Sequence, residues 1–215
     1  KNIKQLANSR ANSRQIQLKL SLIPTIAPYL LPSLLPQLKK NLPQLELLLH
    51  EEKTEDTLRL LNEGKLDAAI LALPFDETGL TYLPLFQERF LAALPKHHPL
   101  SKKTTLTIPD LKEETLLLLK DGHCLRDQTL AVCQHQNRDK RFEATSLETL
   151  KIMVRDGMGV TLLPEMAAKI DKRYLSLKPF KKPEPTREIV LAFRPSSEHI
   201  DTLKTIADCL YKHSF

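Results

Sequence analysis

The chain has 215 residues, enough for one large domain or two smaller α/β domains with a proper buried core. Its net charge of +6 is spread along the chain, and with no Trp and no helix-turn-helix pattern this excess indicates a solvated surface rather than a nucleic-acid groove. Three cysteines are too few for a secreted disulfide scaffold, and no apolar run approaches about 18 residues or resembles a leader, which predicts a cytoplasmic chain without a membrane span.

Strands and helices alternate along the first half of the chain. Residues 1–15 show no core pattern, and we expect them to be the end of a linker from an upstream segment. Alternating apolar residues predict a strand at 17–23, and a helix at 26–40 follows despite its three prolines. The next predicted elements are a strand at 45–49, a helix that opens with Thr54 as its N-cap and stops at Gly64, strands at 67–73 and 89–94, and a loop at 96–103 that contains His97 and His98.

The same alternation continues in the second half. We expect a fully buried strand at 115–119, a helix from about Gly122 that carries two cysteines, a short strand at 141–144, a helix at 146–156 that begins at Ser146, strands at 160–163, 174–178 and 187–193, and a last helix at 197–211. Strands separated by helices of about 10–15 residues are typical of βαβ units. The sequence therefore predicts an α/β fold with a mostly parallel sheet.

Cys124 and Cys133 lie in the run KDGHCLRDQTLAVC, the most informative segment of the chain. If one α-helix joins them, nine residues rise about 13.5 Å and turn about 900°, so the two sulfurs point to opposite faces. A disulfide needs Cα atoms within about 7 Å. A bond between these cysteines therefore requires the helix to unwind, which is the behaviour of a switch rather than of a permanent crosslink.

Several phrases resemble the effector domains of LysR-type transcription regulators: GKLDAAIL at 64–71, KHHPL at 96–100 and GMGVTLLP at 157–164. Four others resemble the peroxide-sensing members of that family, in the same order and with the same cysteine spacing. They are LIPTIAPYLLP (22–32), DGHCLRDQ (121–128), ATSLETL (144–150) and KPEPTR (182–187). The resemblance spans the chain from about residue 17 to its end.

This resemblance implies two Rossmann-like subdomains joined by crossing strands, an architecture similar to the type 2 periplasmic binding proteins. Residues 1–15 would end a linker to a missing DNA-binding domain. Regulatory subdomain I would take 16–86 plus 194–215, and subdomain II, with the redox switch, would take 87–193.

The resemblance also implies a non-enzymatic regulator that senses hydrogen peroxide and binds DNA through its missing N-terminal domain. Cys124 would be the peroxide-reactive thiol and Cys133 the resolving one. No cofactor or metal is implied, whereas a homodimer of this domain within a tetramer and a reducing partner such as glutaredoxin or thioredoxin are. The implied peroxide pocket consists of Thr25, Thr54, His123, Arg126 and Asp127, with Arg194 as a further member.

The chemistry of thiol oxidation, considered without the resemblance, requires similar groups around Cys124. A helix N-terminus and the neighbouring Arg126 favour a lowered pKa for Cys124, but full ionisation lowers the barrier by at most about 2 kcal/mol. A fast sensor therefore needs groups that hold the oxidant, and threonine hydroxyls both donate and accept hydrogen bonds. Thr25 and Thr54 are expected on one side of the sheet, where αβ ligand sites form.

Other interpretations remain open at this point. The domain is alternatively a LysR-type or periplasmic-type effector-binding module with inert cysteines, or a thiol peroxidase. Thr25 and Thr54 can serve simply as N-caps, and Cys209 is expected to be a buried bystander. A zinc site of His123, Cys124, Cys133 and His135 lacks the usual gap of two to four residues between ligands.

Overall fold

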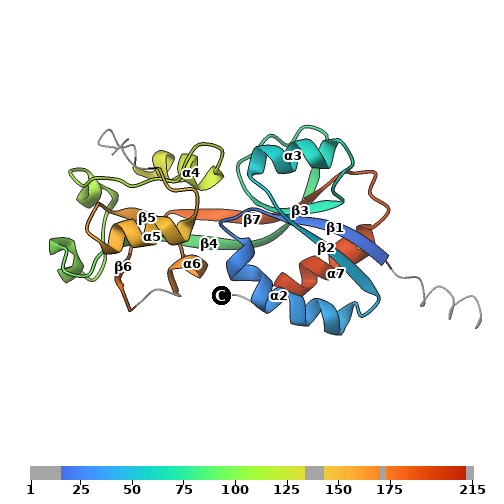
Figure 1. Cartoon of the computed structure of the whole chain (residues 1–215), viewed down its shortest axis with the longest axis horizontal. Helices are drawn as coiled ribbons and strands as arrows, with labels where there is room; N and C mark the ends of the chain where they lie inside the picture. Colours follow the sequence, from blue (N-terminus) through green and yellow to red (C-terminus); the bar gives the residue numbers. More distant parts are fainter. Residues whose placement is uncertain (1–15, 134–142, 170–172, 212–215) are drawn as a thin grey trace, which may run out of the picture.

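A computed structural model describes residues 16–133, 143–169 and 173–211. The expected linker at 1–15 and most of the segment after Cys133, with His135, lie outside the described residues. The described part has two lobes along its longest axis (Figure 1), and one continuous path of strands, β2-β1-β3-β7-β4-β5 with β6 on β4, runs through both. The expected α/β class is confirmed.

The first lobe is built on a parallel unit of three strands. β1 (Ile16–Leu22) pairs in parallel with β2 (Leu45–Glu51) and β3 (Ala68–Ala72). Helices α2 (Ala27–Asn41) and α7 (Ile200–Tyr211) lie together on one side of these strands, and α3 (Thr54–Asn62) lies on the other (Figure 1).

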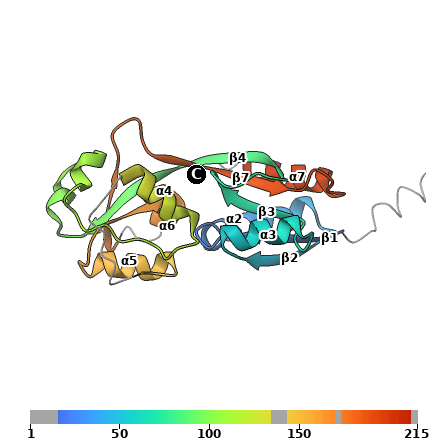
Figure 2. The same cartoon turned by 90° about the horizontal axis from the view of Figure 1, so that it is seen from above.

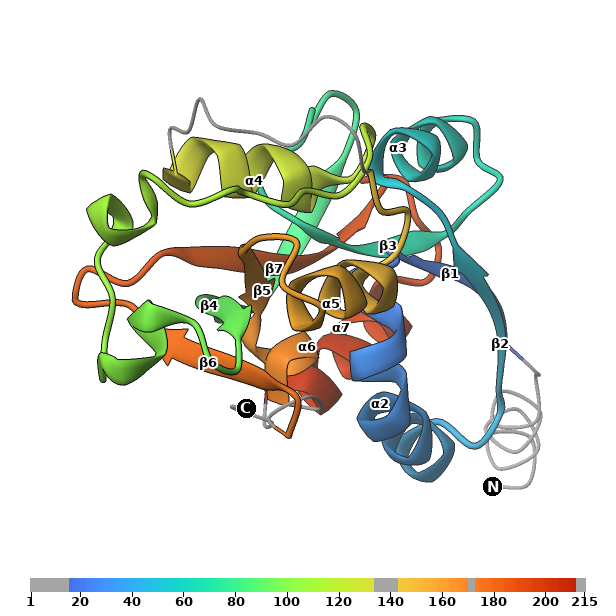
Figure 3. The same cartoon turned by 60° about the vertical axis from the view of Figure 1, so that its left-hand side comes forward.

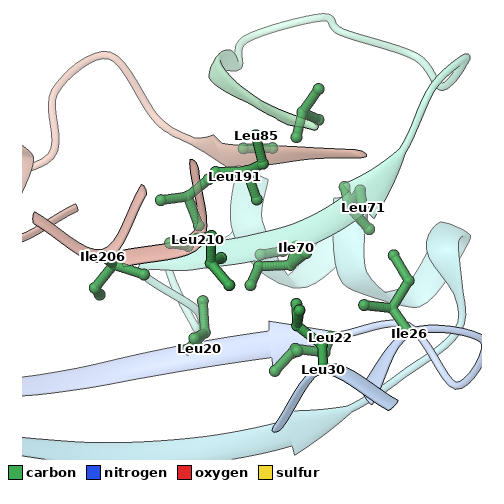
Figure 4. Packing of buried hydrophobic residues seen from close by; sticks show 14 of the residues in the cluster. Leu20, Leu22, Ile26, Leu30, Ile70, Leu71, Leu85, Leu191, Ile206 and Leu210 are labelled. Carbon is green, nitrogen blue, oxygen red and sulfur yellow. The ribbon is translucent and has the colours of Figure 1, made fainter. Parts of the chain in front are cut away.

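The helix α2 forms although Pro32 and Pro36 lie inside it. Each proline removes one backbone hydrogen bond of the helix. Packing outweighs this loss, because Leu30, Leu34 and Leu38 recur every four residues and form a buried stripe. Figure 4 shows Leu30 with Leu20, Ile70 and Leu191 in what we call the first core, formed by buried apolar side chains from 18–85 and 189–210 together with Met166.

Two long strands cross between the lobes, as the resemblance implied (Figure 2). β4 (Thr81–Pro95) pairs with β7 (Thr186–Phe193) over positions 81–89, with a bulge at Leu85, and then with β5 (Thr161–Pro164) and β6 (Leu175–Pro179). Leu85 lies in the first core, whereas Phe90 lies in a second core of buried apolar residues between 90 and 180. Since Ile189–Phe193 pack in the first core, the packing favours a subdomain boundary before Ile189.

The second lobe carries helices α4 (Cys124–Cys133), α5 (Leu147–Arg155) and α6 (Glu165–Lys169), and the short 3-10 helices η1 (Pro99–Lys102) and η2 (Ile108–Leu111). Ser146 stands at the start of α5, as expected: it is the N-cap, and its hydroxyl accepts a hydrogen bond from the Thr149 N–H. The helix α6 was not predicted, because five residues are too few to establish a helical period.

Several expectations for individual elements were wrong. Four of the six pairings between the named strands are antiparallel, because β7 runs against β3 and β4, and β4 runs against β5 and β6. Residues 115–119 are mostly buried but form only isolated bridges at Leu116 and Leu119. β4 begins eight residues earlier than the expected 89, and the N-cap of α3 is Lys53 rather than Thr54. The N-cap of α2 is Ile26, so Thr25 is not the N-cap of that helix.

Candidate functional site

The carboxyl ends of the three parallel strands meet the amino end of α4. Thr25 follows β1, Thr54 follows β2, and Leu73 follows β3. Gln128 of α4 donates a hydrogen bond from Nε2 to the Leu73 carbonyl, 2.8 Å away. Figure 3 shows α4 and α3 on the same side of the molecule, above the strands. This edge of a parallel unit is the usual position of ligand sites in α/β folds.

A left-handed turn at Gly122 introduces α4. Its φ of +88° suits glycine, and an added Cβ would come within 3.2 Å of the Lys53 side chain. The Lys53 ammonium donates to the Asp121 carbonyl at 3.1 Å, which ties the start of α3 to this turn. The turn thus fixes where Cys124 enters the junction between the lobes.

The Cys124 thiol is partly exposed and packs against the first core. Burial raises its pKa, and the positive charge of Arg187, the Thr54 hydroxyl and the Leu125 N–H oppose this only in part; the Asp127 carboxylate raises the pKa further. The expected lowering of the pKa was therefore wrong in direction, because desolvation exceeds the effect of the helix terminus.

Arg187 is the cation that acts on Cys124, and it is completely buried. Its Nη1 donates to the Thr25 hydroxyl at 3.1 Å and its Nη2 to the Thr25 carbonyl at 3.2 Å. On the other side, Nε and Nη2 donate to one oxygen of Glu88 at 2.9 and 2.8 Å. The guanidinium therefore hydrogen-bonds Thr25 and acts on the thiol through its charge, while Thr54 acts on the thiol from α3.

Three side-chain polar atoms of the described residues are buried without a hydrogen bond: the hydroxyl oxygen of Thr54, Nε2 of His123 and Oε1 of Gln128. They come from α3, from the residue before Cys124, and from α4. The His123 side chain is buried, and burial, with a smaller effect of the Lys53 charge, lowers its pKa. Its imidazole is therefore neutral at pH 7. Unsatisfied buried groups of this kind are rare in folded proteins, so this cluster is the candidate place for a bound polar molecule.

Arg126 and Arg194, two of the remaining expected pocket residues, make their contacts elsewhere. The Arg126 guanidinium donates to the Leu119 carbonyl at 2.8 Å and pairs with Asp121 at 2.6 Å, so it holds the loop before α4. Asp127 is exposed on α4. Arg194 donates to the carbonyls of Leu61 and Leu66, at the opposite end of α3 from Thr54. A nine-residue helix is about 13 Å long, so Arg194 is not part of this cluster.

Cys133 is the last residue of α4 and lies in the second core. Its burial raises the pKa of its thiol to about 11. Both cysteines are free thiols, and the single helix expected between them is confirmed, so the sulfurs point to opposite sides of α4 and into different cores. Cys209, also free, is buried in the first core and accepts a hydrogen bond from Asn41 at 3.3 Å.

Sequence reasoning missed Arg187, Glu88 and Gln128. Arg187 stands within the KPEPTR phrase, and a charged residue at the start of an otherwise apolar strand is a signal that could have drawn attention to it. Glu88 had no such signal, because the sequence gives no register between β4 and β7. Only the pairing of Glu88 with Arg187 in that register brings the two charges together.

A cleft with a volume of about 410 Å³ opens next to the thiol site. Residues from both lobes line it, among them Lys53, Asp56, His123, Ser146 and Glu148. Within the described ranges, no cluster of three or more His, Cys, Asp or Glu side chains is suited to hold a metal ion. Across the same ranges, no helix combines the length and the apolar character that crossing a membrane would require.

Two α/β lobes joined by crossing strands, with a cleft and a partly exposed thiol at their junction, define a domain of the periplasmic-binding-protein type. The family model for the LysR substrate binding domain matches residues 11–214. The chain belongs to this family.

Known relatives are similar across most of the chain. The DNA-binding transcriptional dual regulator OxyR of Escherichia coli K12 is 41% identical over 180 residues, covering 80% of this chain and 58% of that protein. The reduced OxyR regulatory domain from Pseudomonas aeruginosa has a TM-score of 0.82 at 37% identity, covering 93% of this chain and 99% of that one. An H₂O₂-bound OxyR mutant from Corynebacterium glutamicum has a TM-score of 0.85 at 31% identity, covering 97% and 68%. The chain spans about 60% of the length of the curated relatives it matches.

Proposed function

We propose that this chain is the regulatory domain of a LysR-type transcription factor that senses hydrogen peroxide by oxidation of Cys124 and a reversible disulfide with Cys133. The observation that carries the proposal is the placement of the two thiols by one helix. Cys124 lies beside unsatisfied polar groups, and Cys133 lies in a separate core. The similarity to OxyR proteins, one of them peroxide-bound, supports it.

The first step forms a sulfenic acid. The sulfur of Cys124 gives up its proton and attacks one oxygen of the peroxide; an S–O bond forms, the O–O bond breaks, and the distal oxygen leaves as hydroxide that takes the released proton to become water. Thr25 and Thr54 would hold the peroxide, and Arg187 would stabilise the negative charge on sulfur and on the leaving oxygen. His123, neutral at pH 7, would accept the thiol proton in transit.

The second step forms the disulfide. The Cys133 sulfur attacks the sulfur of the sulfenic acid, the S–O bond breaks, and the hydroxyl leaves with the Cys133 proton as water. Since the thiols stand about 13.5 Å apart along the axis of α4, the helix must unwind and Cys133 must leave the second core. This repacking is the bistable element that oxidation would bias.

The wider assignments belong to the same proposal. The whole protein would act in the cytoplasm, bind DNA through an N-terminal domain, and assemble as a tetramer in which these regulatory domains form homodimers. Repacking around α4 would alter how the dimers pair. A dithiol partner such as glutaredoxin or thioredoxin would reduce the disulfide and reset the sensor. Arg126 would act by holding the loop before α4 rather than by contacting peroxide, and Asp127 would act through its charge near the thiol.

The decisive experiment follows each thiol by mass spectrometry after a brief pulse of stoichiometric peroxide. Wild type is expected to form a Cys124–Cys133 crosslink, and Cys133→Ser to accumulate a sulfenic acid at Cys124 that a dimedone-type reagent traps. Cys209, also a buried free thiol, serves as the internal control and should remain reduced. Cys124 that stays unreacted at micromolar peroxide, or that reacts no faster than Cys209, would overturn the proposal.

The cleft of about 410 Å³ favours a second function, in which the domain binds a small effector and the cysteines are inert. Its lining contains Lys53, Glu148 and Ser146 from both lobes, so a polar metabolite that contacts them would close the lobes on each other. A change in thermal stability with a metabolite, together with inert thiols under peroxide, would favour this function over the first.

A further inference from the structure

Glu88 is a buried carboxylate for which the proposed chemistry has no direct use. Its side chain is 3% exposed, and the Arg187 side chain beside it is fully buried. One carboxylate oxygen accepts both hydrogen bonds from Arg187, and the other accepts the backbone N–H of Met166 in α6 at 2.8 Å. Both oxygens are therefore occupied, and the carboxylate has a single orientation.

That orientation determines where the guanidinium of Arg187 can point. Because Nε and Nη2 are bound to Glu88, the remaining Nη1 is directed at the Thr25 hydroxyl. Glu88 and Arg187 are also directly paired residues on β4 and β7, so the crossing strands fix the distance between their backbones. The chain of contacts runs from the backbone of α6 through Glu88 and Arg187 to Thr25.

The carboxylate has a second effect on the site. The positive charge of Arg187 is what opposes the burial of Cys124 most strongly. A negative charge 2.8 Å from the same guanidinium offsets that field at the thiol. Glu88 thus improves the placement of Arg187 at Thr25 and at the same time weakens its support for a free thiolate.

We propose that Glu88 is a positioning residue, which aims Arg187 at Thr25 and restrains its charge, so that Cys124 reacts with peroxide seated in the pocket in preference to other electrophiles. This role rests on the proposed peroxide chemistry. Glu88 does not touch the reacting atoms; it acts through Arg187. A purely structural carboxylate would make no distinction between one reagent and another.

The test compares two reagents on one thiol. In a Cys133→Ser background, the rate of Cys124 oxidation by hydrogen peroxide and the rate of its alkylation by iodoacetamide are measured across a pH series. In Glu88→Gln, alkylation at neutral pH should rise about tenfold, as expected for a thiol pKa about one unit lower, while peroxide oxidation falls about tenfold or more. The other groups that act on the thiol, Thr54, the Leu125 N–H and Asp127, are unchanged in the variant.

Two further variants control the result. Glu165→Gln removes another carboxylate paired with an arginine, Arg89 at 2.8 Å, and should leave both rates within about twofold. Glu88→Asp keeps the charge but shortens the reach, so alkylation should stay near wild type while peroxide oxidation falls; it also serves if Glu88→Gln fails to fold.

Opposite changes in the two rates would support the positioning role. Parallel changes, or none, in a folded Glu88→Gln would overturn it, as would an unchanged peroxide rate in Glu88→Asp. If wild-type Cys124 reacted with iodoacetamide but not with peroxide, the proposed function would fail by itself, and the alkylation series would still report whether Glu88 restrains the charge of Arg187.

Discussion

The unwinding of α4 can be tested by a substitution that touches neither thiol nor core. Ala131 is exposed on α4, between the buried residues Thr129 and Cys133. Ala131→Gly should destabilise the helix by about 1 kcal/mol, while the unwound chain in the disulfide form has no helix to weaken. The population of the unwound state should therefore rise about fivefold. If unwinding precedes bonding, the second step should accelerate by the same factor.

The assay quenches peroxide-treated protein at intervals with N-ethylmaleimide and counts the Cys124–Cys133 crosslink by mass spectrometry. Sulfenic acid formation, followed in a Cys133→Ser background, should be unchanged, and the reduction potential of the disulfide should become about 20 mV more negative. Lys204→Gly, exposed on α7, is the matched control and should lower stability without altering the crosslinking rate. An Ala131→Gly variant that crosslinks at the wild-type rate and potential would refute unwinding as a requirement.

Further predictions concern the thiol, the scaffold and the loop helices. Alkylation of Cys124 should still be rising with pH above about pH 8, since its pKa is raised; a plateau below pH 8 would contradict this. Ser146→Ala removes the N-cap of α5 and should cost about 1 kcal/mol, a Tm decrease of about 2–4 °C by calorimetry. Leu71→Ala, in the first core, should cost about 2–5 kcal/mol in urea unfolding. Lys103 and the Thr107 N–H lower the pKa of Asp110 to about 2, so its stabilising effect is present above about pH 4 and is lost as the pH falls toward 2. Asp110→Asn should accordingly be less stable than wild type at pH 7, and the difference should disappear near pH 2.

The fold was largely predictable because local patterns and tertiary packing agree in most elements. The stripe of Leu30, Leu34 and Leu38 identified α2 despite its prolines. Direction was not predictable for the crossing strands, since apolar alternation is the same in parallel and antiparallel pairs. The buried segment 115–119 has the sequence pattern of a strand but forms isolated bridges instead of a continuous ladder of hydrogen bonds. Near it, a Cβ at Gly159 would come within 2.4 Å of the Thr115 carbonyl, a backbone approach that only glycine permits.

The candidate site was likewise predictable only where local sequence patterns identify its residues. Thr25, Thr54, His123 and Cys124 lie next to recognisable helix starts, and Cys133 ends the helix that Cys124 begins, so their phrases could be read from the chain. The partner of the thiol could not, because the nearest charge in sequence is not the nearest in space. Arg126 follows Cys124 by two residues, yet its guanidinium pairs with Asp121. Arg187, which acts on the thiol, lies 63 positions after Cys124 in the chain, on β7, the strand that pairs with β4.

The raised pKa of Cys124 changes how selectivity in the proposed sensor can be explained. A thiol that is permanently ionised reacts with any electrophile that reaches it, including oxidants too large for the pocket. A thiol that is mostly neutral at rest reacts only where something lowers the cost of its charge. Arg187 and the unsatisfied Thr54 hydroxyl supply that help at one point, beside the sulfur. Burial therefore disfavours the free thiolate, and the charge on sulfur is stabilised only when a small molecule with both donor and acceptor groups lies between the thiol and these polar groups. Hydrogen peroxide is small and has both donor and acceptor groups.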